Sequence, residues 1–309
     1  MTLVPPPAAR PAPPPAWLTP LLGQYGDDED GLVVLEQGGT GYVLVEYEDL
    51  LPLVDHGGGR YAAGPGELAR PLEFESAGGE VVAVRLAGRR HVRAHRDAGT
   101  FRVEPLLPEA ELRRRALAAE PPRESGKRAP DLVEIVALEP SIRLDLRYGT
   151  TDNFLGMRFY ERPRALLQRP AAEALARVAA RLRARGYGLW VFDAYRPWHV
   201  TRMFWDATPE HLRHFVADPA SGSRHNRGCA IDLTLYELAT GQPVAMPSGF
   251  DEFTPRAYAA WPGGSSLQRW HRALLREAMA AEGFAVYEFE WWHFDHAGWR
   301  EYPVLDEAM

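Results

Sequence analysis

SGSRHNRGCAIDLTL, residues 221–235, passes from a polar loop into an apolar run that is typical of a buried strand. His225 and Asp232 lie seven residues apart, an odd separation that would place them on opposite faces of one regular strand. Gly228 predicts a bend between them, so that 230–235 forms the strand that carries the aspartate. An aspartate among apolar residues must be paired or bind a metal ion if it is buried. The stretch therefore predicts that His225 and Asp232 converge where the chain enters its core.

A second polar cluster, EWWH at 290–293, lies in the last predicted strand. Catalytic zinc sites use three protein ligands, which nitrogen and oxygen atoms can supply, and keep one position open for water. With the histidine and aspartate above, His293 completes such a set, and Glu290 is left to take a proton from water. Because Glu290 and His293 would face opposite sides of a flat strand, we expect a bulge or twist at 291–292. The alternative is an aromatic edge strand with a glutamate at the surface.

Two residues near these clusters offer alternative roles, one as a nucleophile and one as a metal ligand. Cys229 lies beside His225 but heads an apolar strand, whereas a cysteine nucleophile needs an activating base and an exposed thiolate. We therefore expect Cys229 to be a small core residue. His296, which follows the second cluster, is the rival metal ligand.

The composition argues against several classes of protein. The 309 residues are 46% hydrophobic, enough for one large or two modest domains. A net charge of −7, with acidic and basic residues interspersed, argues against a nucleic-acid partner. The single cysteine excludes an intrachain disulfide. The proline-rich start has no apolar signal-peptide core and no 18-residue apolar run predicts a membrane span, so we expect a cytoplasmic protein.

In the N-terminal third, the residue pattern predicts a proline-rich tail at 1–17 and a small all-β domain at 18–104. Apolar runs separated by glycines, such as GLVVLEQGG and LEFESAGGEVVAVRLAG, are typical of antiparallel strands joined by tight turns. LLGQYG at 21–26, followed by these strands, resembles the small β-barrel modules that are appended to some serine hydrolases of the β-lactamase type. Residues 105–130 are charged and closed by prolines, which predicts a linker with one short helix near 109–119.

Residues 131–309 predict an α+β domain in which helices pack on a mostly antiparallel sheet. Helical periodicity ended by a glycine predicts helices at 169–186 and 265–283. Strand-like runs are found at 135–148, 187–195 and 284–294.

Three motifs follow one another in this domain: Asp-Ala-Tyr-Arg-Pro at 193–197, Ser-x-His-x-x-Gly-x-Ala-x-Asp at 223–232, and Glu-x-x-His at 290–293. They are preceded by RLDLRYGTTDNFLG at 143–156. In this order and spacing the motifs resemble the zinc D-Ala-D-Ala metallopeptidase family, that of the D-alanyl-D-alanine dipeptidases. The resemblance covers about 131–309 and leaves the N-terminal part of the chain outside the family.

The resemblance implies one zinc ion per chain with three ligands, His225, Asp232 and His293. It implies that Glu290 is the catalytic base and that Arg196 stabilises the transition state. Three residues are candidates for substrate binding: Ser223, Asp193 and Tyr195. The alternative for Arg196 is a salt bridge with Asp193 that holds the turn, and the alternative for Ser223 is a cap on its own loop.

The function that we expect from these motifs is zinc-dependent hydrolysis of the D-alanyl-D-alanine dipeptide to two D-alanines. Cell-wall precursor turnover and glycopeptide resistance would both use this reaction. One alternative is a D,D- or L,D-carboxypeptidase that acts on longer muropeptides with the same ligand pattern. Another is a non-catalytic binding module in which zinc is structural and the β-rich domain supplies the partner surface. The sequence does not indicate the oligomeric state.

Overall fold

The computed structural model describes residues 9–26, 31–94 and 99–309, so the first eight residues of the predicted tail lie outside the described residues. The chain forms two compact units. The first holds the residues up to Gly99 with Ala245–Ser248 and Ala260–Ala273, and the second holds Thr100–Val244, Gly249–Ala259 and Leu274–Met309. The boundaries expected at 18–104, 105–130 and 131–309 stay predictions. No helix within the described ranges is long and apolar enough to cross a bilayer.

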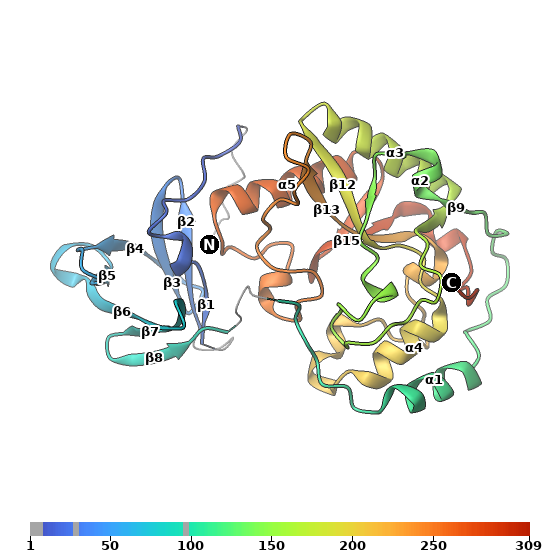
Figure 1. The fold of residues 1–309 in the computed structure, drawn as a ribbon, viewed down its shortest axis with the longest axis horizontal. Helices are drawn as coiled ribbons and strands as arrows, with labels where there is room; N and C mark the ends of the chain where they lie inside the picture. The colour runs from blue at the N-terminus through green and yellow to red at the C-terminus, as the bar shows by residue number, and fades with distance from the viewer. Residues whose placement is uncertain (1–8, 27–30, 95–98) are drawn as a thin grey trace. The chain divides into compact units, whose positions relative to one another are not determined.

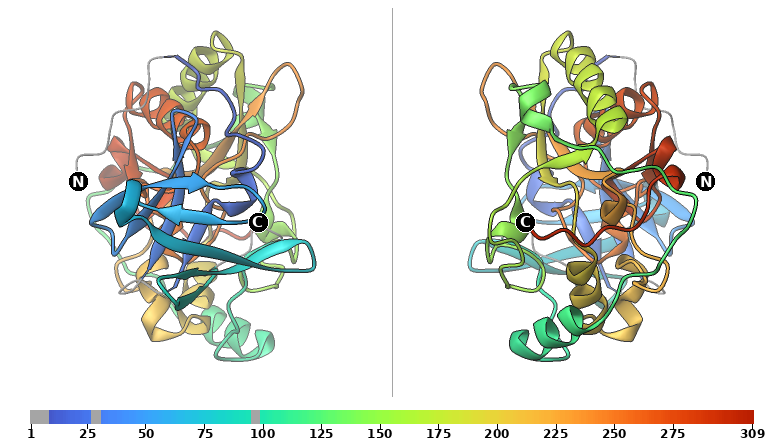
Figure 2. Two further views of the ribbon diagram at one scale, coloured as in Figure 1. Left: turned by 90° about the vertical axis from the view of Figure 1, so that its left-hand side faces the viewer. Right: turned by 90° about the vertical axis from the view of Figure 1, so that its right-hand side faces the viewer.

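The first unit is built on an eight-stranded sheet, drawn blue to cyan in Figures 1 and 2, in which each strand pairs antiparallel with the next. Glycine pairs form two of its tight turns, at 38–39 and 78–79. Gly38 and Gly39, for example, have φ angles of 58° and 84°, a left-handed conformation that other residues rarely adopt. The strands are β1 (Gly23–Tyr25), β2 (Leu32–Gln37), β3 (Thr40–Val45), β4 (Asp49–Asp55), β5 (Tyr61–Ala63), β6 (Arg70–Ala77), β7 (Glu80–Leu86) and β8 (Arg89–Val92).

The end of this sheet returns to its beginning. Tyr25 and Arg93 form an antiparallel bridge. The N–H of Gly26 donates to the carbonyl of Val92 at 2.7 Å. The sheet thereby curves into a near-barrel, and the barrel-like fold expected for this part of the chain is confirmed. Its interior is filled by apolar side chains, which include Leu18, Leu21, Tyr25, Leu32, Val34, Val43, Leu53, Leu72, Val81, Val84 and Leu86.

The first unit also contains the beginning of helix α5 (Ser266–Ala280). Ser265 and Gln268 form a reciprocal cap, because the Gln268 N–H donates to Ser265 Oγ at 3.1 Å and the Ser265 N–H donates to Gln268 Oε1 at 2.8 Å. The carboxylate of Glu36, a buried residue of β2, accepts from the N–H of Ser266 at 2.7 Å. A buried charge that is bonded in this way holds the start of α5 on the barrel.

The second unit contains a five-stranded sheet in the order β10-β12-β13-β15-β14. β10 runs parallel to β12 and the other neighbours pair antiparallel, which confirms the expected mostly antiparallel sheet. The strands are β10 (Arg143–Leu144), β12 (Tyr187–Asp193), β13 (Ala230–Glu237), β14 (Phe284–Tyr287) and β15 (Glu290–His296). A separate pair is formed by β9 (Leu132–Glu134) and β11 (Leu166–Gln168).

Helices cover the sheet of the second unit. Figure 1 shows α3 (Arg169–Arg183) above the strands, and α1 (Glu109–Ala118) with α4 (Trp198–Ala207) below them. The apolar stripe of α3, which includes Leu175 and Val178, is buried as its periodicity predicts. The helix expected near 109–119 is α1.

Two predicted strands are wrong. The run 135–148 forms the short helix α2 (Ile135–Leu138) and only two residues of strand, because Pro140 lies in its middle and cannot donate to a strand ladder. The run 284–294 is not one strand but a hairpin of β14 and β15. Its turn, Glu288-Phe289, contains neither glycine nor proline and therefore carries no turn signal in the sequence.

Candidate metal centre and active site

The loop before β13 bends as the sequence predicts. His225 begins a single 3-10 turn that Gly228 ends with a left-handed φ of 65°. The N–H of Gly228 donates to the carbonyl of His225 at 3.0 Å and closes the turn. A Cβ atom at position 228 would lie 2.4 Å from the side chain of Leu132, so the close approach also requires glycine. The bend turns the imidazole of His225 towards Asp232 on β13.

Strand pairing brings the third residue to the same place. Asp232 of β13 lies directly opposite His293 of β15 in the register of the sheet. His293 Nδ1 lies 3.0 Å from Asp232 Oδ1 and 3.0 Å from His225 Nε2, and His225 Nε2 lies 3.4 Å from Asp232 Oδ2. Among the described residues these three form the one cluster of buried donors close enough to share a metal ion. Donors that bind one zinc ion at about 2.0–2.2 Å have separations of this size.

Each imidazole is oriented by a second hydrogen bond. His225 Nδ1 donates to the carbonyl of Ala194 at 2.6 Å, which leaves Nε2 to face the cluster. His293 Nε2 lies 3.0 Å from Oδ1 of Asp295, which leaves Nδ1 to face the cluster. Outer partners of this kind fix the tautomer and orientation of histidines that bind metal ions. Both the orientation of the imidazoles and the chemical types of the donor atoms therefore fit a metal ion.

The charges in the cluster also favour a cation. Burial by itself raises the pKa of Asp232, but His225 and His293 outweigh it and hold that pKa well below its ordinary value. Burial by itself lowers the pKa of His293, but Asp295 and Asp232 raise it well above the ordinary value. The negative field that retains a proton on His293 would equally stabilise a divalent cation.

Glu290 shares this cavity. It is the first residue of β15, and its Oε2 lies 3.7 Å from His293 Nδ1. The pairing of β15 with β14 is irregular here: Val286 lies opposite Phe294 while Tyr287 lies opposite Glu290. The extra residues on β15 form the irregularity that we expected around 291–292, and they bring Glu290 and His293 to one side. Burial raises the pKa of Glu290 to about 7.

Arg196 follows β12 and is buried between two carboxylates. Its Nε donates to Asp193 Oδ2 at 2.9 Å, and its Nη2 lies 3.5 Å from Asp232 Oδ2. The guanidinium also lies over the ring of Phe204, 4.8 Å from its centroid. Arg196 therefore has the salt bridge that we considered as its alternative role, and it lines the cavity as well.

The three candidate substrate-binding residues lie in different environments. Ser223 lines the cavity, but its Oγ accepts the N–H of His225 at 3.2 Å and so caps its own loop. Asp193 is buried behind Arg196, where it accepts from the hydroxyl of Tyr160 at 2.8 Å. The hydroxyl of Tyr195 bonds to the backbone of Glu307 instead, and Tyr195 does not line the cavity. The structure does not bring Tyr195 together with the other site residues.

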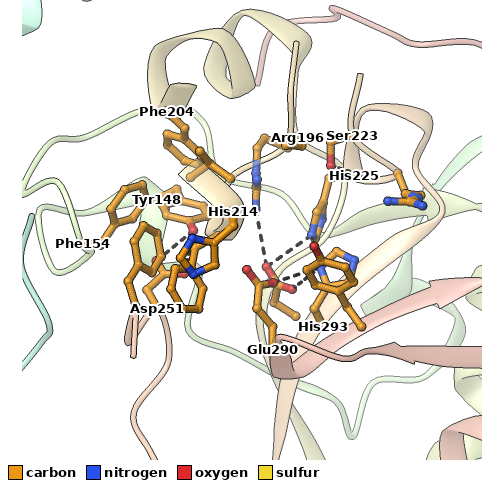
Figure 3. Close-up of a pocket in the computed structure, with 17 residues that line it drawn as sticks. Tyr148, Phe154, Arg196, Phe204, His214, Ser223, His225, Asp251, Glu290 and His293 are labelled. Carbon is orange, nitrogen blue, oxygen red and sulfur yellow. Dashed lines mark hydrogen bonds and ion pairs between the residues drawn. The ribbon is translucent and has the colours of Figure 1, made fainter. Parts of the chain in front are cut away.

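The far end of the cavity was not predicted. Figure 3 shows Tyr148, Phe154 and Asp251 on one side of it and Glu290 and His293 on the other. The hydroxyl of Tyr148 donates to Asp251 at 2.8 Å, and burial raises the pKa of Asp251 well above its ordinary value. Asp251 has a left-handed φ of 58°, a conformation that is uncommon for residues other than glycine and that recurs at functional sites. Tyr148 belongs to the quoted stretch 143–156, whereas Asp251 lies in a loop without a recognisable motif.

The competing residues are not in the cluster. Cys229 is buried, and burial raises the pKa of its thiol to about 12, so it is a core residue as expected. His296 instead caps the turn after β15, where its Nδ1 accepts from the N–H of Gly298 at 3.2 Å.

Comparison with known proteins agrees with this site. The family model described as D-Ala-D-Ala dipeptidase matches residues 128–305. The D-alanyl-D-alanine dipeptidase of Escherichia coli is 36% identical over 179 residues, which cover 58% of this chain and 91% of that protein. That of Enterococcus faecalis is 37% identical over 171 residues, which cover 50% of this chain and 85% of that protein. The chain therefore belongs to the D-Ala-D-Ala dipeptidase family of M15 metallopeptidases.

Proposed function

We propose that the chain hydrolyses D-alanyl-D-alanine to two D-alanines with one zinc ion per chain. The observation that carries this proposal is the convergence of His225, Asp232 and His293 in one buried cluster beside Glu290. Two nitrogens and one carboxylate oxygen are a donor set of catalytic zinc sites. When bound there, zinc polarises the scissile carbonyl and lowers the pKa of a water molecule.

Glu290 moves the proton in this reaction. Its carboxylate takes a proton from the attacking water, whose oxygen joins the carbonyl carbon. The same proton then passes to the nitrogen of the leaving D-alanine as the C–N bond breaks. Burial raises the pKa of Glu290 towards neutrality, which favours both halves of this transfer, because the carboxyl group must accept and release a proton near neutral pH.

Arg196 supplies positive charge for the oxygen of the scissile carbonyl, on which negative charge develops. Asp193 and the ring of Phe204 hold the guanidinium in place before the reaction. A charge that is already oriented in a buried site stabilises a transition state without further reorganisation.

The cavity favours a free dipeptide. Its volume is about 90 Å³, which suits the methyl side chains of alanine. Burial and neighbouring acids keep the pKa of Asp251 high, and the ammonium group of a dipeptide at this end of the cavity would supply the positive charge that lowers it (Figure 3). A muropeptide has an uncharged amide at that position and would leave the carboxyl group without a cation. The dipeptidase is therefore favoured over a carboxypeptidase that acts on longer chains.

Release of free D-alanine tests the proposal. We expect the zinc-loaded protein to cleave D-Ala-D-Ala, a chelator to abolish cleavage, and added zinc to restore it. L-Ala-L-Ala and a pentapeptide that ends in D-Ala-D-Ala should remain intact. Cleavage of the pentapeptide would identify a carboxypeptidase instead, and zinc binding without any cleavage would identify the binding module. Metal analysis tests the stoichiometry, and cell fractionation tests the cytoplasmic location, which stays a proposal.

A further inference from the structure

Two arginines line the cavity, and they differ in how they are bonded. Arg196 is buried and ion-paired to Asp193 and Asp232. Arg224, the residue before His225, has a side chain that is 42% exposed, and its guanidinium forms no hydrogen bond within the described part of the chain. It is the cation of this cavity that retains donors for a ligand.

The guanidinium of Arg224 is nevertheless held in place. It lies over the ring of Trp299, 4.8 Å from its centroid. Its Nε lies 3.5 Å from Oδ2 of Asp295, the carboxylate whose other oxygen orients His293. Both contacts restrict the side chain without using the two terminal amino groups. An arginine fixed in this way loses little conformational entropy when it binds a carboxylate through two parallel hydrogen bonds.

The position of Arg224 matches the polarity of the proposed substrate. Arg224 is tied through Asp295 to the histidine end of the cavity, and Asp251 lies at the other end (Figure 3). We place the ammonium group of the dipeptide at Asp251 and its amide at the histidines. Its carboxylate must then lie on the far side of the histidines from Asp251. That carboxylate needs a cation of its own, because Arg196 already serves the oxygen of the scissile carbonyl and is ion-paired to Asp193 and Asp232.

We propose that Arg224 binds the free α-carboxylate of the substrate's C-terminal residue. This inference rests on the proposed hydrolysis of D-Ala-D-Ala and deepens it. According to this inference, the protein prefers substrates with a free C-terminal carboxylate, and Arg224 is the residue that determines this preference. A substrate with a C-terminal amide lacks the negative charge and leaves the guanidinium without its partner.

The test compares hydrolysis of D-Ala-D-Ala and of its C-terminal amide by the full-length, zinc-loaded protein. We expect kcat/KM for the acid to exceed that for the amide by about 10- to 100-fold, the usual contribution of hydrogen bonds between charged groups at a partly exposed site. In R224Q this ratio should fall close to 1, through a higher KM for the acid and little change for the amide. R224K, which keeps the charge but not the paired donors, should restore part of the preference.

R300Q is the matched control, because Arg300 also stacks on Trp299, 4.2 Å from its centroid, but does not line the cavity. Its preference for the acid should equal that of the unmodified protein. Equal hydrolysis of acid and amide by the unmodified protein would overturn the inference and leave the proposed function intact. If R224Q lost kcat/KM equally on the acid and the amide and bound less zinc, the inference would be overturned. Arg224 would then act by holding the metal-binding histidines in place. No hydrolysis of either substrate would refute the proposed function itself.

Discussion

Oδ1 of Asp295 lies 3.0 Å from Nε2 of His293, two residues earlier on β15. Residues two apart on a strand point to the same face, so the sheet itself places the carboxylate behind the imidazole. The contact leaves Nδ1 of His293 to face Asp232. A histidine that binds metal through Nδ1 therefore depends on Asp295 for its orientation.

Replacement of Asp295 by asparagine should lower zinc affinity about 10- to 100-fold, because the imidazole loses a charged partner that holds its tautomer. Competition with a chelating dye measures this affinity. D131N is the control, since Asp131 forms an exposed ion pair with Arg169 and should leave zinc affinity unchanged. Unaltered zinc affinity in D295N would show that Asp295 does not orient the histidine.

Replacement of Glu290 by glutamine should leave zinc bound while turnover of D-Ala-D-Ala falls about 10²- to 10⁴-fold, the usual effect of losing a general base. The amide has nearly the same shape as the carboxylate but cannot take a proton. Metal analysis and D-alanine release on the same sample separate binding from catalysis. Undiminished turnover would remove Glu290 from the mechanism.

Activity should fall as the pH is lowered, because Glu290 acts only as a carboxylate. Burial raises its pKa from 4.5 to about 7, whereas a divalent cation in the adjacent cluster would lower it again. We therefore expect the acid limb of kcat/KM to have an apparent pKa between these two values. Zinc content measured at each pH distinguishes protonation of Glu290 from loss of the metal. A rate that stays constant down to pH 4.5 would contradict this assignment.

Replacement of Gly228 by alanine should destabilise the fold by about 1–2 kcal/mol from the left-handed φ alone, with an added cost from the clash with Leu132. Because the turn carries His225, zinc affinity should fall as well. Gly186 provides the control: its φ is 85°, but a Cβ atom there would meet nothing within 4 Å. Chemical denaturation should show a larger loss in the free energy of unfolding for G228A than for G186A. Equal losses would show that the clash with Leu132 contributes nothing.

The local sequence determined the chemistry of the site and much of the architecture. The odd spacing of His225 and Asp232, with a glycine between them, predicted the bend before β13, because a regular strand alternates its faces. The same rule predicted the irregularity near Trp291. Glycine-punctuated apolar runs predicted the strands of the barrel, since turn chemistry is a local property.

Tertiary structure decided what depends on contacts between distant segments. The hairpin at Glu288-Phe289 has no turn signal, and it forms because β15 pairs with β13 on one side and β14 on the other. Asp251 enters the cavity from a loop without a motif. Tyr195 belongs to the Asp-Ala-Tyr-Arg-Pro motif, yet its hydroxyl bonds to Glu307. Adjacency in sequence gives the type of side chain available, but burial and strand pairing select which side chains share a cavity.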